Sequence, residues 1–163
     1  MNNIILCGFK ACGKSSLAQR VASCTDYRYV DTDLLISQDV RNLYCEQGET
    51  FFRNREEEVI SSLRDIRGAI IATGGGSVLS ALNCAILKEV GILIYLRVEK
   101  AELQRRIFSK PLPSFFDVKD PFASFEQVYA TRIPMYERVA DYTVDQEEKL
   151  WEILDFLQDK RVY

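Results

Sequence analysis

The chain has 163 residues, a length that fits a single domain covering residues 1–163. Its 21 basic and 24 acidic residues give a formal net charge of -3, so no broad basic field favours nucleic acid as a partner. The absence of histidine excludes Ser-His-Asp triads and histidine-based metal sites. Any catalysis must therefore use carboxylates, lysine, arginine and hard cations.

Membrane insertion and secretion are not indicated either. No apolar stretch approaches the roughly 18 residues of a membrane span, and the N-terminus "MNNIILCGFK" lacks a basic region before its apolar run. The five cysteines form an odd number without a CxxC pair, which is typical of a reducing compartment. We therefore expect a soluble, unprocessed, cytoplasmic protein with no membrane partner, and we expect it to act as a monomer.

Five apolar runs of β type divide the chain, and stretches of helical spacing separate them. The runs are "NIILC", "YRYV", "AIIAT", "GILIYL" and "DYTV", and the helical stretches include "GKSSLAQRVAS" and "EKLWEILDFL". Alternation of this kind predicts an α/β fold, in which a five-stranded parallel sheet is flanked by helices on both faces as a three-layer sandwich.

The segment "GFKACGKS" directly follows the first apolar run and precedes a helical stretch. Gly8, four residues, then Gly13, Lys14 and Ser15 have the spacing and the strand-loop-helix context of a P-loop. Its backbone N–H groups and helix N-terminus would bind a phosphate chain, with Lys14 on the β and γ phosphates and Ser15 on the Mg²⁺ that accompanies the nucleotide. We expect these nucleotide contacts from Gly8, Ala11, Cys12, Gly13, Lys14, Ser15 and Ser16.

A P-loop alone does not separate a GTPase switch, a motor ATPase and a small-molecule kinase. The sequence has no NKxD motif for guanine, and the DxxG match "DIRG" precedes an apolar run instead of following one. A motor ATPase usually needs a longer chain to couple hydrolysis to work. A compact phosphotransferase is the reading that remains.

The second apolar run ends in "VDTD", which places Asp31 and Asp33 at the carboxyl end of the sheet, where open α/β folds bind ligands. If this segment is extended, alternation sends both carboxylates the same way. One could hold Mg²⁺ through water while the other accepts a hydrogen bond, and a proton, from a substrate hydroxyl. An ordinary helix cap is an equally frequent reading of such a pair.

Two further segments carry candidate ligand groups. The stretch "GETFFRNREEE" (48–58) begins with a turn glycine and continues as a charged helix, most of whose charges should be solvated. The stretch "IIATGGGS" (70–77) ends a buried strand in three glycines, which suits close approach of a ligand to the backbone as well as a flexible turn.

Three of the four prolines fall within "SKPLPSFFDVKDP" (109–121), which makes this segment the best candidate for a mobile loop. With Phe115 and Phe116 between the prolines, it could form a stiffened flap over the nucleotide that excludes water. An ordinary surface loop is the alternative. We place this lid at about residues 107–121.

Taken together, these segments resemble the shikimate kinase family, which has a nucleoside-monophosphate-kinase-like P-loop fold with a mobile lid. "GFKACGKS", "DTD", "GETFFRNRE", "TGGG", "KPL" and "RIPMYERVADYTVD" occur in the family's order from residue 4 to about 145. The GExxFRxxE spacing from Gly48 to Glu56 is the most selective element. The resemblance implies ATP-dependent phosphorylation of the shikimate 3-hydroxyl, with Mg²⁺ as the cofactor and shikimate 3-phosphate and ADP as products.

The resemblance also implies roles for individual residues. It gives Lys14 to the phosphates, Ser15 and Asp31 to Mg²⁺, and Asp33 to the shikimate hydroxyls, within a substrate-binding region at about 32–60. It gives the shikimate carboxylate to Arg53 and Arg132, and the ring hydroxyls to the backbone of Gly74, Gly75 and Gly76. Arginine suits a carboxylate because its planar fork binds both oxygens.

The lid departs from the family pattern. Lys110 stands before Pro-Leu where the family usually has arginine, and the approach "LQRRIFSKPLPSF" is about three residues shorter than expected. We assign Lys110 to the transferred phosphate and Arg106 to stacking on adenine. Arg105 is the alternative for the adenine contact, and Arg106 is the alternative for the phosphate contact. Two other readings stay open at this point: a kinase of another small hydroxy acid or nucleotide, and a nucleotide-binding relative that has lost turnover.

Overall fold

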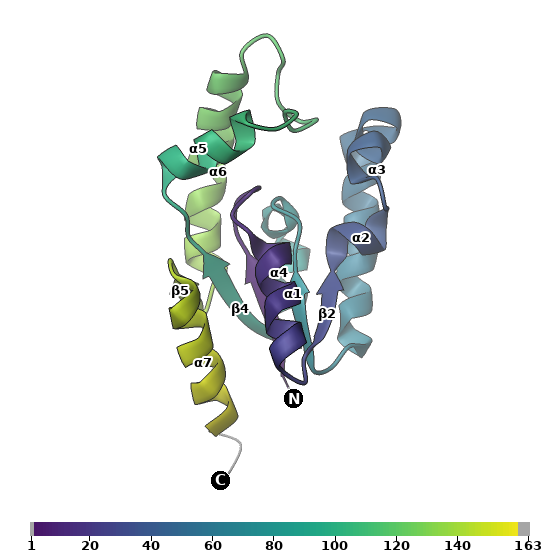
Figure 1. Cartoon of the computed structure of the whole chain (residues 1–163). Coiled ribbons are helices and arrows are strands. Elements are labelled where there is room, and N and C mark those ends of the chain that lie inside the picture. The colour runs from purple at the N-terminus through teal and green to yellow at the C-terminus, as the bar shows by residue number, and fades with distance from the viewer. Residues whose placement is uncertain (1, 160–163) are drawn as a thin grey trace.

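The computed structural model describes residues 2–159. A parallel sheet of five strands, in the order β2-β3-β1-β4-β5, forms the centre of this part of the chain (Figure 1). Each strand coincides with one of the five apolar runs, so the predicted sheet is confirmed. The strands are β1 (Asn3–Cys7), β2 (Arg28–Asp31), β3 (Ala69–Ala72), β4 (Gly91–Leu96) and β5 (Tyr142–Val144).

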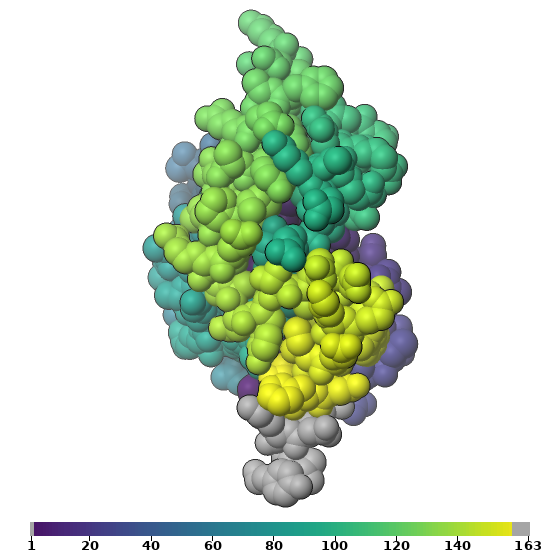
Figure 2. All heavy atoms as spheres, turned by 90° about the vertical axis from the view of Figure 1, so that its left-hand side faces the viewer, coloured from purple at the N-terminus to yellow at the C-terminus, as the bar shows by residue number. Residues whose placement is uncertain are grey.

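Helices cover both faces of the sheet, as the alternating pattern predicts. In Figure 1, α1 and α7 lie on the near face, and α3, α4 and α6 lie behind. Figure 2 views the molecule from the left-hand side of Figure 1 and shows α6 beside α5 in the upper part and beside α7 in the lower part. The helices are α1 (Lys14–Cys24), α2 (Thr32–Ile36), α3 (Val40–Ser62), α4 (Ala81–Val90), α5 (Lys100–Phe108), α6 (Pro121–Val139) and α7 (Glu147–Asp159).

Local sequence signals explain where several helices begin and bend. The side chains of Asp39, Ser80 and Asp120 each accept a hydrogen bond from the backbone at the start of α3, α4 and α6. Pro121 occupies the first turn of α6, where its missing N–H is not needed. Gly48, at φ 82°, interrupts α3, so the predicted turn glycine lies inside a longer bent helix that already begins at Val40.

The core is built around β1, all five residues of which are buried between two layers of helices. Ile4, Ile5 and Leu6 are fully buried, and burying such a side chain contributes roughly 1.5–3 kcal/mol. The buried amide of Asn3 donates to the carbonyl oxygens of Ile66 and Val90 and accepts from the Ala69 N–H. This residue therefore ties the starts of three strands together at the edge opposite the site.

Because all five strands are parallel, their carboxyl ends meet at one edge of the sheet. The P-loop follows β1 there, the DTD segment follows β2, and the three glycines follow β3. Helix α5 continues through Phe108 and α6 begins at Pro121, so the non-helical part of the proposed lid is 109–120. Figure 1 shows this segment arching from α5 toward α3 at the same end of the molecule.

Candidate active site

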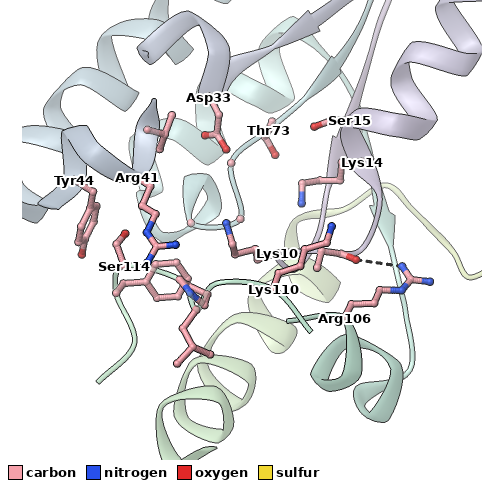
Figure 3. A pocket seen from close by; sticks show the side chains of 18 of the residues that line it. Lys10, Lys14, Ser15, Asp33, Arg41, Tyr44, Thr73, Arg106, Lys110 and Ser114 are labelled. Carbon is pink, nitrogen blue, oxygen red and sulfur yellow. Dashed lines mark hydrogen bonds between the residues drawn. The ribbon is translucent and has the colours of Figure 1, made fainter. Parts of the chain in front are cut away.

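A cavity of about 610 Å³ opens at the carboxyl edge of the sheet. The P-loop, the starts of α2 and α3, the loop after β3, the 105–115 segment and α6 line this cavity. Figure 3 shows that their polar side chains point into it. The residues expected from the sequence that line it are Ala11, Gly13, Lys14, Ser15, Ser16, Asp33, Arg53, Gly74, Gly75, Gly76, Arg106, Lys110 and Arg132.

Three expected residues do not line the cavity: Gly8, Cys12 and Asp31. Gly8 and Cys12 face each other on the side of the loop away from the cavity, where a Cβ atom on Gly8 would come within 2.9 Å of Cys12 Sγ. The Cys12 side chain is buried and does not reach the cavity. The structure thus separates the residues that shape the loop from those that face the cavity.

The P-loop curls around the ammonium group of Lys14. Its Nζ donates to the carbonyl oxygens of Gly8 at 2.9 Å and Phe9 at 3.0 Å, and lies 3.6 Å from Cys12 Sγ. Helix α1 begins at Lys14, with Gly13 in the left-handed region at φ 99°. The backbone N–H groups at this helix start face the cavity edge, an arrangement that favours anions.

One non-glycine residue of the loop, Ala11, has a positive φ of 67°. An L-residue in this region is strained by about 1–2 kcal/mol, whereas glycine is not. We expect Ala11→Gly to raise the free energy of unfolding slightly, because relief of strain exceeds the roughly 0.4–1 kcal/mol of extra chain entropy that glycine brings to the unfolded state. Ala11→Val should lower it. Thermal unfolding of both variants checks this order, and a less stable glycine variant would contradict it.

Asp31 is the N-cap of α2 as well as a neighbour of the P-loop. Its Oδ1 accepts the backbone N–H of Asp33 at 2.9 Å, and its Oδ2 accepts the hydroxyls of Ser15 at 2.6 Å and Tyr29 at 3.0 Å. Asp31 therefore fits both interpretations of the aspartate pair: its carboxylate caps a helix, and it also contacts Ser15, the expected Mg²⁺ ligand.

Asp33 lies in the first turn of α2, so the expected extended segment with two parallel carboxylates is wrong. The helix begins directly after Asp31 and directs Asp33 toward the loop after β3. A Cβ atom on Gly74 would lie 2.7 Å from Asp33 Oδ1, so glycine leaves the room that this carboxylate occupies. Burial, together with the charges of Asp31 and Glu56, raises the pKa of Asp33 above its usual range.

Arg53 is held at the cavity wall by a buried acid. Its Nη1 lies 2.9 Å from Glu56 Oε2, and Glu56 Oε1 accepts the Ser77 hydroxyl at 2.9 Å. Glu56 is 1% exposed, which makes it a fully buried carboxylate with a partner for each oxygen. The guanidinium also packs on Gly76, where a Cβ atom would come within 2.6 Å of it.

Arg132 approaches the same wall from α6. It is buried, and its guanidinium lies 4.7 Å from the centre of the Phe115 ring. The adjacent Tyr136 hydroxyl donates to the Gly75 carbonyl oxygen, which ties α6 to the glycine loop. Burial and the nearby charge of Arg53 lower the pKa of Arg132 from its ordinary value, while Tyr136 and Glu56 act in the opposite direction.

On the other side of the cavity, Arg106 contacts the P-loop itself. Its Nη1 donates to the Ala11 carbonyl oxygen at 3.1 Å, and its Nε pairs with Glu102 at 2.7 Å (Figure 3). The arginines Arg105 and Arg106 lower the pKa of Glu102 to about 2. Lys110 is exposed and its side chain lies beside the P-loop in the same view.

Sequence reasoning did not assign several residues that line this cavity. Glu56 stood within the "GETFFRNRE" spacing, where its charge alone suggested a solvated helix face. Lys10 occupies a variable position of the P-loop motif, and Arg41 lies in a stretch that contains no motif. The unassigned polar residues that line the cavity include Lys10, Arg41, Tyr44, Glu56, Thr73 and Ser114.

The described residues contain no helix long and apolar enough to cross a membrane. Within the same part of the chain, no group of three or more acidic or cysteine side chains is placed to hold a metal ion.

Several known proteins with related sequences are named shikimate kinase. The family model described as shikimate kinase matches residues 10–159. A shikimate kinase of Pasteurella multocida (strain Pm70) is 37% identical over 153 residues, covering 90% of this chain and 87% of that protein. One from Haemophilus influenzae (strain PittEE) is 35% identical over 153 residues, covering 90% of this chain and 84% of that protein.

Solved structures agree with the sequence comparison. The structure of shikimate kinase from Acinetobacter baumannii in complex with shikimate has a TM-score of 0.85 at 25% identity, covering 100% of this chain and 96% of that chain. A gluconokinase from Sinorhizobium meliloti 1021 has a TM-score of 0.61 at 16% identity, which shows a shared fold alone. The predicted P-loop kinase fold is confirmed.

Proposed function

This chain belongs to the shikimate kinase family, and from that premise we propose that it transfers the γ-phosphoryl group of ATP to the 3-hydroxyl of shikimate. The products are shikimate 3-phosphate and ADP. The observation that carries the proposal is one cavity in which a P-loop lysine, a partly buried aspartate and two guanidinium groups face a common space. A small acid with one carboxylate and several hydroxyls needs cations on one side and an acceptor on the other.

The nucleotide occupies the P-loop side. Lys14 contacts its β and γ phosphates, together with backbone N–H groups between Ala11 and Ser16. Arg106 lies against the loop at the Ala11 carbonyl, which suits a place beside the adenine. Lys110 reaches the phosphate chain from segment 109–120, which folds over the nucleotide and excludes water.

The residues present fit a nucleotide-bound Mg²⁺ ion. Ser15 Oγ and Asp31 Oδ2 lie 2.6 Å apart, and oxygen atoms are the ligands that Mg²⁺ takes in proteins. Asp31 accepts four hydrogen bonds, one of them from Ser15, and these two residues would hold the ion. When bound, the ion would supply positive charge beside the β and γ phosphates.

Asp33 orients the acceptor. Its carboxylate accepts a hydrogen bond from the 3-hydroxyl, and takes that proton as the oxygen–phosphorus bond forms and the bond to the β-phosphate oxygen breaks. The electron pair of the broken bond leaves with ADP. The raised pKa of Asp33 brings its proton affinity closer to what this transfer needs.

The acceptor carboxylate binds between Arg53 and Arg132. We expect Arg53→Ala and Arg132→Ala each to raise the KM for shikimate by roughly thirtyfold or more, because losing one partner of a buried charge pair costs ~2–5 kcal/mol. The KM for ATP should change little. Arg55→Ala and Arg138→Ala are matched controls, since these arginines lie on the same two helices outside the cavity lining. An ATP defect as large as the shikimate defect would contradict this assignment.

A coupled assay of ADP release tests the proposed function. It compares the rate with ATP alone, with added shikimate, and with gluconate as a hydroxy acid of similar charge. A rate that depends on shikimate supports the proposal. A preference for gluconate would make the chain a kinase of another hydroxy acid, and a rate that no acceptor changes would leave a nucleotide-binding protein without this activity.

A further inference from the structure

Lys10 stands at the tip of the P-loop and has no part in the roles given above. Its side chain lines the cavity. In Figure 3 it lies between Lys14 on the nucleotide side and Arg41 on the acceptor side, below Asp33. No other lysine of the P-loop has this position, because Lys14 is enclosed by the loop itself.

The backbone that carries Lys10 is fixed on two sides. Within the loop, the Cys12 N–H donates to the Phe9 carbonyl oxygen at 3.2 Å and closes a turn around Lys10. Toward the acceptor side, the backbone nitrogen of Lys10 lies close to Gly75: a Cβ atom added to Gly75 would be 3.3 Å from it. The backbone position of Lys10 is therefore fixed by these two contacts, whereas Lys110 belongs to a long loop segment.

The charges around Lys10 match a site of phosphoryl transfer. Partial desolvation and the cations Lys14, Arg41 and Arg132 lower the pKa of Lys10, and Asp33 opposes them. Asp33 has the strongest charge interaction with this lysine, and Lys14 comes next. In the proposed complex, the acceptor hydroxyl lies beside Asp33 and the γ-phosphate beside Lys14. The Lys10 side chain lines the same cavity below Asp33 and next to Lys14 (Figure 3), which places its ammonium group where the two substrates would meet.

The ammonium group of Lys10 is also available. Among residues 2–159 it has neither a hydrogen-bond partner nor an ion-pair partner. Lys14, in contrast, already donates two hydrogen bonds to backbone carbonyl oxygens of its own loop. A cation with all three donors free can follow the charge that spreads over the three equatorial oxygens in the transition state.

From this placement we propose that Lys10 is a further catalytic residue, whose ammonium group contacts the phosphoryl group as it passes from ATP to the acceptor hydroxyl. The proposal rests on the proposed function. Lys10 donates hydrogen bonds and transfers no proton: the hydroxyl proton goes to Asp33, and the electron pair of the broken bond leaves with ADP. Its contribution is greatest in the transition state, so it acts on kcat more than on binding of either substrate.

The kinetic test uses the full chain with Lys10→Met, Lys10→Arg and the control Lys88→Met, which removes the same charge from an exposed site on α4. We expect Lys10→Met to lower kcat at least tenfold while both KM values change less than threefold. Lys10→Arg should restore at least a third of wild-type kcat, and the control should match wild type. Thermal unfolding of each variant shows whether the fold is kept.

A kcat for Lys10→Met within twofold of wild type would overturn the proposal. A rise in the KM for shikimate alone, or for ATP alone, of the same size as the expected kcat loss would also overturn it, since Lys10 would then bind a ground state. These outcomes leave the proposed function standing. A wild-type protein without shikimate-dependent turnover would instead refute the proposed function first, and this proposal with it.

A binding measurement adds a readout that does not depend on turnover. ADP, Mg²⁺ and aluminium fluoride mimic the transferring phosphoryl group, and calorimetry gives their Kd in the presence of shikimate. We expect Lys10→Met to weaken this complex at least tenfold while the Kd for MgADP alone stays within twofold of wild type. Equal weakening of both complexes would contradict contact with the transferred group.

Discussion

Replacing Lys14 with methionine should lower kcat at least a hundredfold. Lys14 is the cation that the P-loop encloses, and removal of one preorganised donor from a charge that develops in the transition state costs ~10²–10³ in rate. Methionine keeps the length and most of the volume of the side chain. Steady-state rates with saturating ATP and shikimate measure the effect.

This variant needs a folding control, because Lys14 is buried and its loss leaves the Gly8 and Phe9 carbonyl oxygens without a donor. Such a loss costs ~1–3 kcal/mol of stability, so the unfolding midpoint should fall while circular dichroism at the assay temperature stays unchanged. A folded Lys14→Met protein that kept more than about a tenth of wild-type turnover would contradict the P-loop assignment.

The second large effect separates the two aspartates. Asp33→Asn should lower kcat at least a hundredfold and weaken shikimate binding, because the amide can neither take the hydroxyl proton nor hold its hydrogen bond as strongly. Asp31→Asn should act chiefly through Mg²⁺, so raising the metal concentration should rescue this variant alone. Rates measured across a Mg²⁺ series give the answer, and equal rescue of both variants would refute the division of roles.

The pH dependence of kcat/KM gives a further check on Asp33. Its pKa is raised in the fold, so the ionised form that accepts the proton is lost at a higher pH than for an ordinary aspartate as the solution is acidified. The acid limb of kcat/KM should therefore lie above the usual aspartate range. An acid limb within that range would show that Asp33 is not the group that titrates.

The sheet and the P-loop could be predicted because each rests on a local signal. The five apolar runs give the strands, and the spacing from Gly8 to Ser15 gives the loop and the start of α1 at Lys14. Parallel strand order then brings the DTD and TGGG segments to the same edge. Asp33 lines the cavity as that topology predicts. Arg53 and Arg132 lie within α3 and α6, and only the resemblance to the shikimate kinase family pointed to them.

Features that depend on packing between distant segments could not be predicted. The extended geometry expected for the DTD segment failed because Asp31 caps a helix that begins at the next residue. In the sequence, Glu56 is one of three consecutive glutamates and was expected to be solvated. In the fold it is buried and pairs with Arg53 and Ser77. Lys10 occupies a position of the P-loop motif that any residue can fill, so the motif gave it no role. Its place near the acceptor side depends on the contact of the P-loop with Gly75.

The position of the phosphate on the product tests the central claim most directly. Wild-type protein is incubated with ATP, Mg²⁺ and shikimate, and phosphorus and proton NMR identify the carbon that bears the new phosphoester. We expect one molecule of shikimate 3-phosphate for each ADP released. Phosphate on another hydroxyl, or ADP released with inorganic phosphate and unchanged shikimate, would contradict the account.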